Sequence, residues 1–242
     1  MKIKLTGTGS ITSMQNCASC LINEEILIDC GNGIIKSLMK NSIDIYKINI
    51  VLITHLHADH FFDLPFIILL RSFRRVKEQL VIYGPKGLRK AIALLFEVGY
   101  ADIEDWEEHL NNGNTLIMEY TELDVAVNKY RIKSYEVNHG NFKPAYGFTV
   151  SDEQSILGYS GDSGICLGVE EIVKKSDLAI MDCSFPQGVE AHMGVNDLER
   201  LLNQYDDKEI VATHMSSESR KLALSSNNER LIVLEDMFEI EI

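Results

Sequence analysis

The sequence has little of several features that would place it in a specialised class of protein. Its 242 residues include only 4 prolines, 1 tryptophan and 5 cysteines. The cysteines are too sparse, and odd in number, for a disulfide framework. The longest apolar run, Phe66–Leu70, is far too short to cross a bilayer, and the first ten residues lack the apolar stretch of a signal peptide. We therefore expect a cytoplasmic protein with reduced thiols and no membrane partner.

Positive charge is also scarce. Lysine and arginine together number 23 against 36 aspartates and glutamates, which gives a net charge of −13. Such a surface repels polyanions over long range, so we expect no long duplex nucleic acid as a partner. A small anionic substrate remains compatible with this charge, because a metal ion in a cleft outweighs the distant average.

The composition that remains is ordinary for a globular protein, 45% hydrophobic and 24% charged, and the length fits one large domain or two small ones. Short apolar runs alternate with turn signals, which predicts an α/β (or α+β) fold of sheets covered by helices. The expected strands are Ile3–Leu5, Cys20–Ile22, Ile26–Ile28, Asn49–Ile53, Asp124–Val127, Tyr130–Val137, Tyr146–Val150, Ile156–Tyr159, Leu178–Met181 and Ile210–Thr213. Helices are expected over Leu88–Val98 and over Asp197–Gln204, with Asn196 as the cap of the second, and a hairpin over Arg230–Ile242.

The most informative stretch follows a buried apolar strand and reads THLHADH. It places three imidazoles and a carboxylate within six positions, at His55, His57, Asp59 and His60. Imidazole and carboxylate are the ligands that zinc and related ions take at catalytic sites. His55 and His57 can converge on one ion while Asp59 and His60 turn toward a second. The alternative, a histidine-rich surface loop, is disfavoured because this pattern seldom arises by chance at this histidine content.

Three more candidate ligands follow expected strands further along the chain. His139 lies in Val-Asn-His-Gly, Asp162 in Tyr-Ser-Gly-Asp-Ser-Gly and His214 in Ala-Thr-His-Met. Taken alone, each is more often a satisfied turn or core residue than a ligand. Together with the first cluster, and with His192 in Ala-His-Met, they leave only His109 outside a motif, and this concentration of histidines predicts a metal site.

Weaker signals concern the substrate. Arg71 stands in the only basic cluster, with Arg74, Arg75 and Lys77, and is our candidate for a phosphate contact, although such a run is more often a solvated face. Tyr146 and Phe142 could stack on a base or simply form a wall, and Ser160 beside the Asp162 motif is a third candidate contact. Cys17 and Cys20 have zinc-knuckle spacing but no second pair, so buried thiols are favoured over a metal site.

The ordered motifs THLHADH, a lone histidine, SGDS and a final THM resemble the metallo-β-lactamase superfamily over nearly the whole chain. The finer resemblance is to the ribonuclease Z-like phosphodiesterases, including an armless branch that acts on cyclic phosphates. It is carried by Gly-Thr-Gly at 7–9, Leu-Ile-Asp-Cys-Gly at 27–31, Asp-Leu-Pro at 63–65, Ile-Tyr-Gly-Pro at 82–85, Met-Asp-Cys-Ser-Phe at 181–185 and Ala-His-Met at 191–193.

This resemblance implies a single domain over residues 1–242, built as a four-layer αββα sandwich of two mixed sheets with helices outside. Two pseudo-symmetric halves are expected, roughly residues 1–130 and 131–242. The implied cofactor is a pair of Zn²⁺ ions, with manganese or iron as alternatives. The resemblance assigns the ligands by position: His55, His57 and His139 to the first ion, Asp59, His60 and His214 to the second, and Asp162 to both. It also implies that the chain can form a homodimer.

The resemblance further suggests a catalytic set of His192, Asp182 and Asp59. Hydrolysis of a phosphodiester by a metal-bound hydroxide also needs a proton for the leaving alkoxide, and His192 is the candidate acid. Asp182 would orient His192, although the family carries a longer glutamate at that position. A polar turn before a helix is the alternative explanation of this pair.

The chain departs from ribonuclease Z in one respect. Its relatives grip transfer RNA with a long arm inserted between the lone histidine and the SGD motif, whereas here only 22 residues lie between His139 and Asp162. We therefore predict a metal-dependent phosphodiesterase acting on a cyclic nucleotide, a cyclic sugar phosphate or a short oligonucleotide. The alternatives are transfer-RNA 3′ processing, hydrolysis of a thioester, lactone or β-lactam on the same scaffold, a metal-binding protein without turnover and, more remotely, an iron redox enzyme.

Overall fold

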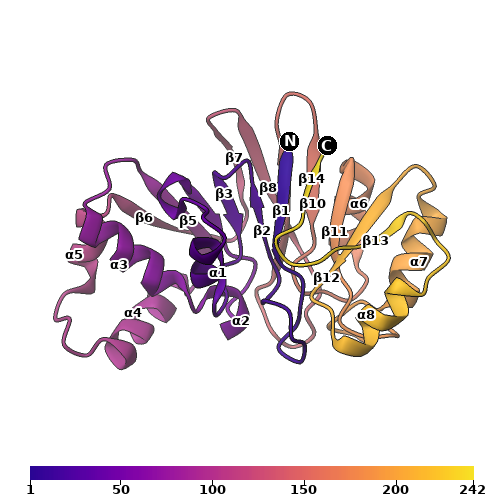
Figure 1. Ribbon diagram of the computed structural model, residues 1–242, viewed down its shortest axis with the longest axis horizontal. Coiled ribbons are helices and arrows are strands. Elements are labelled where there is room, and N and C mark those ends of the chain that lie inside the picture. The colour runs from indigo at the N-terminus through magenta and orange to yellow at the C-terminus, as the bar shows by residue number, and fades with distance from the viewer.

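Two seven-stranded sheets, packed face to face, form the centre of the computed structural model, which describes residues 1–242. Helices cover the outer face of each sheet, and both termini lie together at one end of the sandwich (Figure 1). The predicted four-layer αββα arrangement is thus confirmed. No helix is long and apolar enough to cross a bilayer.

The first sheet combines antiparallel and parallel strands. In spatial order it consists of β14 (Glu239–Glu241), β1 (Lys2–Gly7), β2 (Ser19–Ile22), β3 (Ile26–Ile28), β4 (Ile50–Leu52), β5 (Leu80–Pro85) and β6 (Thr115–Tyr120). Strands β14 to β3 pair antiparallel and β3 to β6 pair parallel. Strand β4, which leads into the THLHADH motif, is an Ile-Val-Leu run buried on both faces, as a central parallel strand requires.

The second sheet repeats this pattern. In spatial order it consists of β13 (Leu231–Val233), β12 (Glu209–Thr213), β11 (Leu178–Asp182), β10 (Ile156–Tyr159), β9 (Tyr146–Ser151), β8 (Tyr130–Glu136) and β7 (Asp124–Val127). Strands β7 to β10 pair antiparallel and β10 to β13 pair parallel. The chain changes sheets between β6 and β7, slightly before residue 130, where the sequence suggested that the halves divide.

Helices divide between the two outer layers. Over the first sheet lie α1 (Ile34–Lys40), the 3₁₀ turn η1 (Ile45–Lys47), α2 (Ala58–Phe61), α3 (Leu64–Arg74), α4 (Leu88–Gly99) and α5 (Trp106–Asn112). Over the second lie α6 (Leu167–Lys175), α7 (Val195–Gln204) and α8 (Ser217–Leu224). Three apolar cores result, one between the sheets and one under each helical layer. Burying both faces of each sheet fixes the strand ends, from which the candidate site is built.

Two local predictions were wrong. Helix α7 begins at Val195 with Gly194 as its N-cap, whose N–H donates to the Asp197 carboxylate at 3.1 Å, whereas Asn196 accepts from Gly188 N instead of capping the helix. The C-terminal hairpin does not form. Strand β13 joins the second sheet beside β12, and β14 crosses to pair with β1 in the first sheet, so the chain end links the two halves.

Candidate metal centre

The residues that the sequence singled out converge at one edge of the sandwich, where strands of both sheets end. His55, His57, Asp59 and His60 follow β4, and the other ligand candidates follow β8, β10 and β12. Because neighbouring parallel strands present their carboxyl ends at the same edge, residues far apart in sequence meet here. All seven predicted ligands belong to groups whose donor atoms lie within 4.8 Å of one another.

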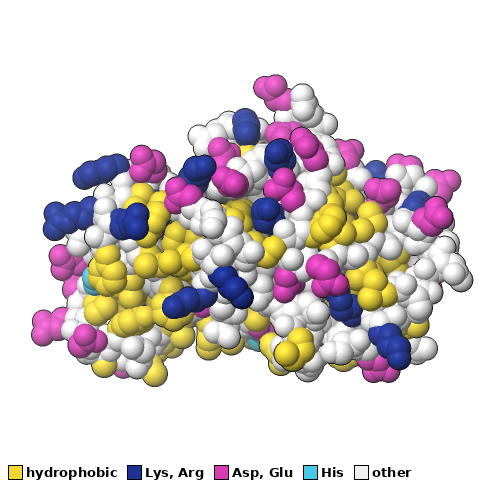
Figure 2. Space-filling view, in the orientation of Figure 1, with side chains coloured by type: hydrophobic (Ala, Val, Ile, Leu, Met, Phe, Trp, Pro, Cys, Tyr) yellow, Lys and Arg dark blue, Asp and Glu magenta, His cyan; other side chains and the backbone are white.

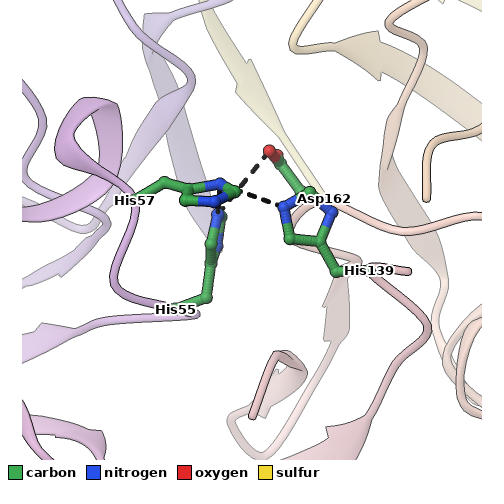
Figure 3. A group of neighbouring side chains, drawn as sticks. All are labelled: His55, His57, His139 and Asp162. Carbon is green, nitrogen blue, oxygen red and sulfur yellow. Dashed lines mark hydrogen bonds and ion pairs between the residues drawn. The ribbon is translucent and has the colours of Figure 1, made fainter. Parts of the chain in front are cut away.

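One group joins His55, His57, His139 and Asp162 (Figure 3). The Nδ1 atom of His57 lies 3.1 Å from Nε2 of His55 and 3.0 Å from Nε2 of His139. A single ring nitrogen can satisfy only one such partner, so hydrogen bonding does not account for all three rings. Nitrogens bound at ordinary zinc distances around one tetrahedral ion would be roughly 3.3 Å apart, which is close to this spacing. The three imidazoles therefore fit one shared cation.

A second group joins Asp59, His60 and His214, with Asp162 between the two groups. Oδ2 of Asp162 lies 3.7 Å from Nε2 of His55, 3.4 Å from Nε2 of His60 and 3.3 Å from Nε2 of His214. His60 Nε2 is completely buried and has no hydrogen-bond partner. An orphaned buried nitrogen facing two carboxylates is costly unless a cation completes its environment.

Outer hydrogen bonds fix which nitrogen turns inward in four of the five ligand imidazoles, His55, His60, His139 and His214. His60 Nδ1 donates to Asp29 Oδ2 at 2.8 Å, and His139 Nδ1 donates to the carbonyl of Ala191 at 3.1 Å. Because a carboxylate and a carbonyl can only accept, Nε2 of each ring keeps its lone pair for the centre of the cluster.

Two hydroxyl relays do the same for His55 and His214. Thr54 Oγ1 donates to the Asp29 carboxylate at 3.0 Å and therefore accepts from Nδ1 of His55, also at 3.0 Å. Ser184 Oγ donates to Asp182 Oδ1 at 2.6 Å and accepts from Nδ1 of His214 at 2.8 Å. Each sheet thus contributes one buried aspartate that orients ligands through a hydroxyl. Sequence reasoning gave no role to Asp29, Thr54 or Ser184, although Asp29 stands in the quoted Leu-Ile-Asp-Cys-Gly motif and Thr54 directly precedes His55.

The electrostatics of the cluster favour a positive charge at its centre. Burial alone would lower the pKa of His60 and His214, but the neighbouring carboxylates outweigh it and raise both. Burial would raise the pKa of Asp162, yet His214 and His60 hold it well below its usual range. A divalent cation supplies this charge without protonating the ligands. The donor set, its geometry and its charge all fit a metal ion.

Backbone conformation brings these residues together. Asp29 and His214 both have positive φ, 58° and 54°, which is uncommon for residues other than glycine and costs on the order of 1–2 kcal/mol each. Gly31 lies so close to the metal loop that a Cβ would be 1.8 Å from the carbonyl oxygen of Asp59. The strand end at Leu27–Gly31 therefore packs directly beneath the THLHADH loop, which explains the small residue there.

His192 and Asp182 lie beside the second group of ligands. His192 Nδ1 donates to Asp182 Oδ2 at 2.8 Å, and its ring stacks on that of His214 with centroids 5.5 Å apart. Asp182 is completely buried and also accepts from the backbone N–H groups of Ser163 and Ser184. Burial lowers the pKa of His192, but the hydrogen bond and charge of Asp182 raise it by more. The structure thus brings together the pair expected to deliver a proton.

The cavity above these residues has a volume of about 470 Å³, in the range of small-molecule sites. His57, Asp59, Asp162, His192 and His214 line it, together with two segments that sequence reasoning did not assign, Ser10–Thr12 and Ser184–Phe185. These residues lie on connections between elements, which give no periodic signal, so the sequence alone offered little to identify them.

The three predicted substrate contacts are not brought to this cavity. Arg71 is completely buried under the first helical layer. Tyr146 packs between the sheets against Tyr120 and donates its hydroxyl to the Thr121 carbonyl. Ser160 is completely buried, accepts from Asp182 N and donates to the Gly161 carbonyl. Arg71, Tyr146 and Ser160 therefore stabilise the scaffold, and their assignment to substrate binding was wrong. Phe142 instead packs on His57, with ring centroids 3.9 Å apart.

Arg71 allows this correction to be tested. Its guanidinium donates to the backbone carbonyls of Tyr46, Ile48, Glu78 and Gly113. Arg71→Ala should lower the free energy of unfolding by about 3 kcal/mol, because buried carbonyls lose their donors. The KM of the protein that remains folded should be unchanged. Urea unfolding monitored by circular dichroism measures this effect, with the exposed Arg74→Ala as the matched control. A raised KM at unchanged stability would restore Arg71 to substrate binding.

Cys17 and Cys20 belong to none of the metal-binding groups. Cys20 is buried in the core between the sheets, and burial raises its pKa, so it behaves as an apolar side chain.

A family model described as "Anti-Pycsar protein Apyc1" matches residues 1–238. The chain belongs to this family. It also belongs to the ribonuclease Z-like branch of the metallo-β-lactamase superfamily, as its motifs suggested. One relative, the ribonuclease Z of Methanosarcina acetivorans, is 26% identical over 100% of this chain and 98% of its own length.

Two solved structures have the same fold. Human tRNase Z, short form, superposes with a TM-score of 0.75 at 24% identity and covers 100% of this chain and 99% of that one. A diphosphatase of the PhnP family superposes with a TM-score of 0.79 at 16% identity and covers 100% and 97% of the two chains. This member of the Apyc1 family thus has the complete fold of these relatives.

Proposed function

We propose that this metal-dependent phosphoric diester hydrolase acts on a small ester, namely a cyclic nucleotide, a cyclic sugar phosphate or a short oligonucleotide. The observation that carries the proposal is the position of His192. Its ring lines the same cavity as His57, Asp59 and His214, and Asp182 holds its Nδ1 so that Nε2 faces away from that carboxylate. Hydrolysis of a thioester releases a thiolate, which needs such an acid less than a sugar alkoxide does.

We propose two divalent ions, with zinc first and manganese or iron as alternatives. His55, His57 and His139 would hold one, Asp59, His60 and His214 the other, and Asp162 both, which matches two of the three groups of neighbouring donors. The third group joins Asp162, Asp182, His192 and His214. Ions bound there would activate water near neutral pH and neutralise charge on the phosphate oxygens. Seven protein ligands leave room for substrate oxygens.

The chain's own residues then have defined tasks. His192, whose protonated form Asp182 favours by raising its pKa, delivers a proton from Nε2 to the leaving oxygen. Ser184 hydrogen-bonds both Asp182 and His214, and so ties the orientation of the acid to that of a ligand. Asp29 and Thr54 hold His60 and His55 in the tautomers that binding requires.

Two observations favour a small ester over precursor transfer RNA. Between His139 and Asp162 the chain forms only strands β9 and β10 and short connections, with no protruding arm. The residues that line the cavity include no lysine or arginine to hold neighbouring phosphates. Because the sequence is similar to that of ribonuclease Z, transfer-RNA processing is the second candidate function.

A substrate panel separates the two. We expect the zinc- or manganese-loaded protein to open 3′,5′- or 2′,3′-cyclic nucleotides, followed by ³¹P NMR, and to leave a precursor transfer RNA with a 3′ trailer intact on a denaturing gel. Cleavage of the precursor at its 3′ boundary, without turnover of any cyclic ester, would reverse this assignment.

All five cysteines are unpaired, which supports the cytoplasmic location that we also propose.

The homodimer remains a prediction, and we propose a surface for it. Hydrophobic side chains gather over α1, α3 and the segment that follows α4 (Figure 2), around a groove of about 610 Å³ that includes Met39, Phe66 and Phe73. Two exposed side chains of opposite charge also line the groove, Lys36 of α1 and Asp102, which precedes α5. In a two-fold contact Lys36 of one copy would meet Asp102 of the other.

Phe73→Asp should therefore convert a dimer to a monomer, because it places a charge in the apolar centre of the contact. Light scattering after size-exclusion chromatography measures the mass. Val98→Asp, at a still more exposed position of α4 outside the groove, is the control. A dimer that persists in Phe73→Asp would exclude this surface.

A further inference from the structure

The candidate ligand His214 stands just beyond the hydrogen-bonded part of β12, in a strained backbone conformation. Its φ of 54° lies in the left-handed region that residues other than glycine seldom adopt. Such a conformation persists only where the surrounding contacts hold it in place. The next residue, Met215, is 1% exposed and makes those contacts through its backbone.

The connection between β1 and β2 holds both backbone groups of Met215. Met215 N donates to the carbonyl of Thr8 at 3.0 Å, and Ser10 N donates to the carbonyl of Met215, also at 3.0 Å. These bonds form an isolated parallel bridge between Gly9 and Met215, which joins the first sheet to the second at the edge that carries the ligands. The position of His214 therefore depends on where the turn from Thr8 to Ser10 lies.

One carboxylate, that of Asp236, fixes this turn. Its Oδ1 accepts from the backbone N–H of Thr8 at 2.9 Å and from the Thr8 hydroxyl at 2.8 Å, and its Oδ2 accepts from Asn16 N at 2.7 Å. Gly9 N donates to the carbonyl of Asn16 at 2.9 Å, which closes the connection on itself. Because Thr8 is completely buried, loss of the carboxylate would leave its N–H and hydroxyl without an acceptor, at a cost in free energy.

Asp236 reaches this turn from the far end of the chain. It belongs to the segment between β13 and β14, which crosses from the second sheet to the first (Figure 1). Contacts on both sides of Asp236 hold the segment: Leu5 N donates to the carbonyl of Phe238 at 2.9 Å, and the Arg220 guanidinium of α8 donates to the carbonyl of Leu234 at 3.1 Å. Elements of both halves of the molecule thus keep the carboxylate in place.

We propose that Asp236 is a positioning residue for the second metal ion: through Thr8 and Met215 it holds His214 in the conformation that turns the imidazole toward the cluster. The inference rests on the proposed pair of ions. Asp236 belongs to none of the groups of donors and does not line the cavity, so it acts only through its neighbours. Ser184 fixes the rotation of the His214 ring, and Asp236 fixes the backbone that carries it.

The first test measures zinc affinity by competition with a chromophoric chelator. Asp236→Ala should bind one zinc ion per chain as tightly as the wild type and the other about 10- to 100-fold more weakly, the usual effect of losing a residue that orients a ligand. Asp236→Asn keeps an oxygen that can accept from Thr8, so its loss should be smaller. Diester turnover that Asp236→Ala loses at limiting zinc should return at saturating zinc.

Glu239→Ala is the matched control, because it removes one carboxylate from the same end of the chain. Glu239 pairs with Lys4 at 3.1 Å and does not contact the turn, so both zinc affinities should equal those of the wild type. If Asp236→Ala is less stable in urea but keeps both affinities, the proposal is overturned and Asp236 is a purely structural residue. Should Asp236→Ala not fold, Asp236→Asn decides: weaker binding of one ion supports the proposal, and unchanged affinities overturn it.

A second readout identifies the affected ion. Long-range ¹H–¹⁵N NMR spectra of the zinc-loaded chain report the ring nitrogens of each histidine. In Asp236→Ala the signals of His214 should shift, while those of His55, His57 and His139 keep their wild-type positions. Shifts confined to those three residues would contradict the proposal.

Neither measurement needs a substrate, so the two proposals fail separately. If the wild type binds two ions but opens no diester, the phosphodiesterase proposal fails, and zinc affinity still decides the role of Asp236. If the wild type binds no ion, the metal proposal fails, and the spectrum of the metal-free chain decides. The tautomer of His214 that donates to Ser184 should then be lost in Asp236→Ala, and an unchanged tautomer would overturn the inference.

Discussion

His57→Ala should lower the turnover of any phosphodiester by at least about 1,000-fold and reduce the amount of bound metal. The reason is that Nδ1 of His57 lies at the centre of the first metal group, next to the nitrogens of two other imidazoles. Its Nδ1 lies 3.0 Å from His139 and 3.1 Å from His55, so its loss opens one side of the first metal group. The remaining ligands leave that ion short of a donor and weaken its binding. Metal content by plasma emission spectroscopy and initial rates on the same sample measure both effects.

His109→Ala is the control for this experiment, since His109 is the one histidine outside the cluster and hydrogen-bonds only Ser72. It should keep full metal content and full turnover. A His57→Ala protein that hydrolyses diesters without bound metal would show that the metal assignment is wrong.

His192→Ala should retain its metal but slow the release of poor leaving groups by about 100- to 10,000-fold, the usual contribution of a positioned general acid. Esters with an activated leaving group, such as p-nitrophenolate, should lose far less, since that anion departs without a proton. The separation is expected because His192 bonds Asp182 and only stacks on the ligand His214.

The readout is the slope of log kcat/KM against the pKa of the leaving group across a series of diesters, and this slope should become steeper in the variant. Phe142→Ala, which removes a ring packed on ligands but no proton donor, serves as a comparison and should leave the slope unchanged. Equal losses on activated and unactivated esters would remove His192 from the role of acid.

The sequence predicted the convergence of the candidate ligands well, because each of them follows a strand. His139, Asp162 and His214 stand within three residues of the ends of β8, β10 and β12, and strands that run in the same direction bring such ends to one edge. Metal ligands are also chemically distinctive. A cluster of imidazoles and carboxylates carries information in its residue types as well as in its spacing.

The side chains assigned to substrate were harder to place, because residue type did not determine where they point. Tyr146 begins a strand that is buried on both faces, so its ring enters the core between the sheets. Arg71 lies on the buried face of α3. Its guanidinium N–H groups donate to four backbone carbonyls there, so they are not available to bind a phosphate. A basic run in a sequence does not distinguish these uses.

The C-terminus shows a second limit. Strands β13 and β14 have three residues each and lie close in sequence, which favours a hairpin on local evidence. They instead join different sheets, because β1 and β12 each offer an unpaired edge that a short strand can cover. Edge availability depends on the whole topology and is not encoded in the local pattern.

The most direct test of the central claim is the hydrolysis of bis(p-nitrophenyl) phosphate by the zinc- or manganese-loaded protein, measured beside a thioester and a lactone and repeated after chelation. The account predicts metal-dependent release of p-nitrophenolate from the diester, lost on chelation, with little or no turnover of the acyl substrates. Rapid hydrolysis of the thioester or lactone by a protein that leaves the diester intact would contradict it.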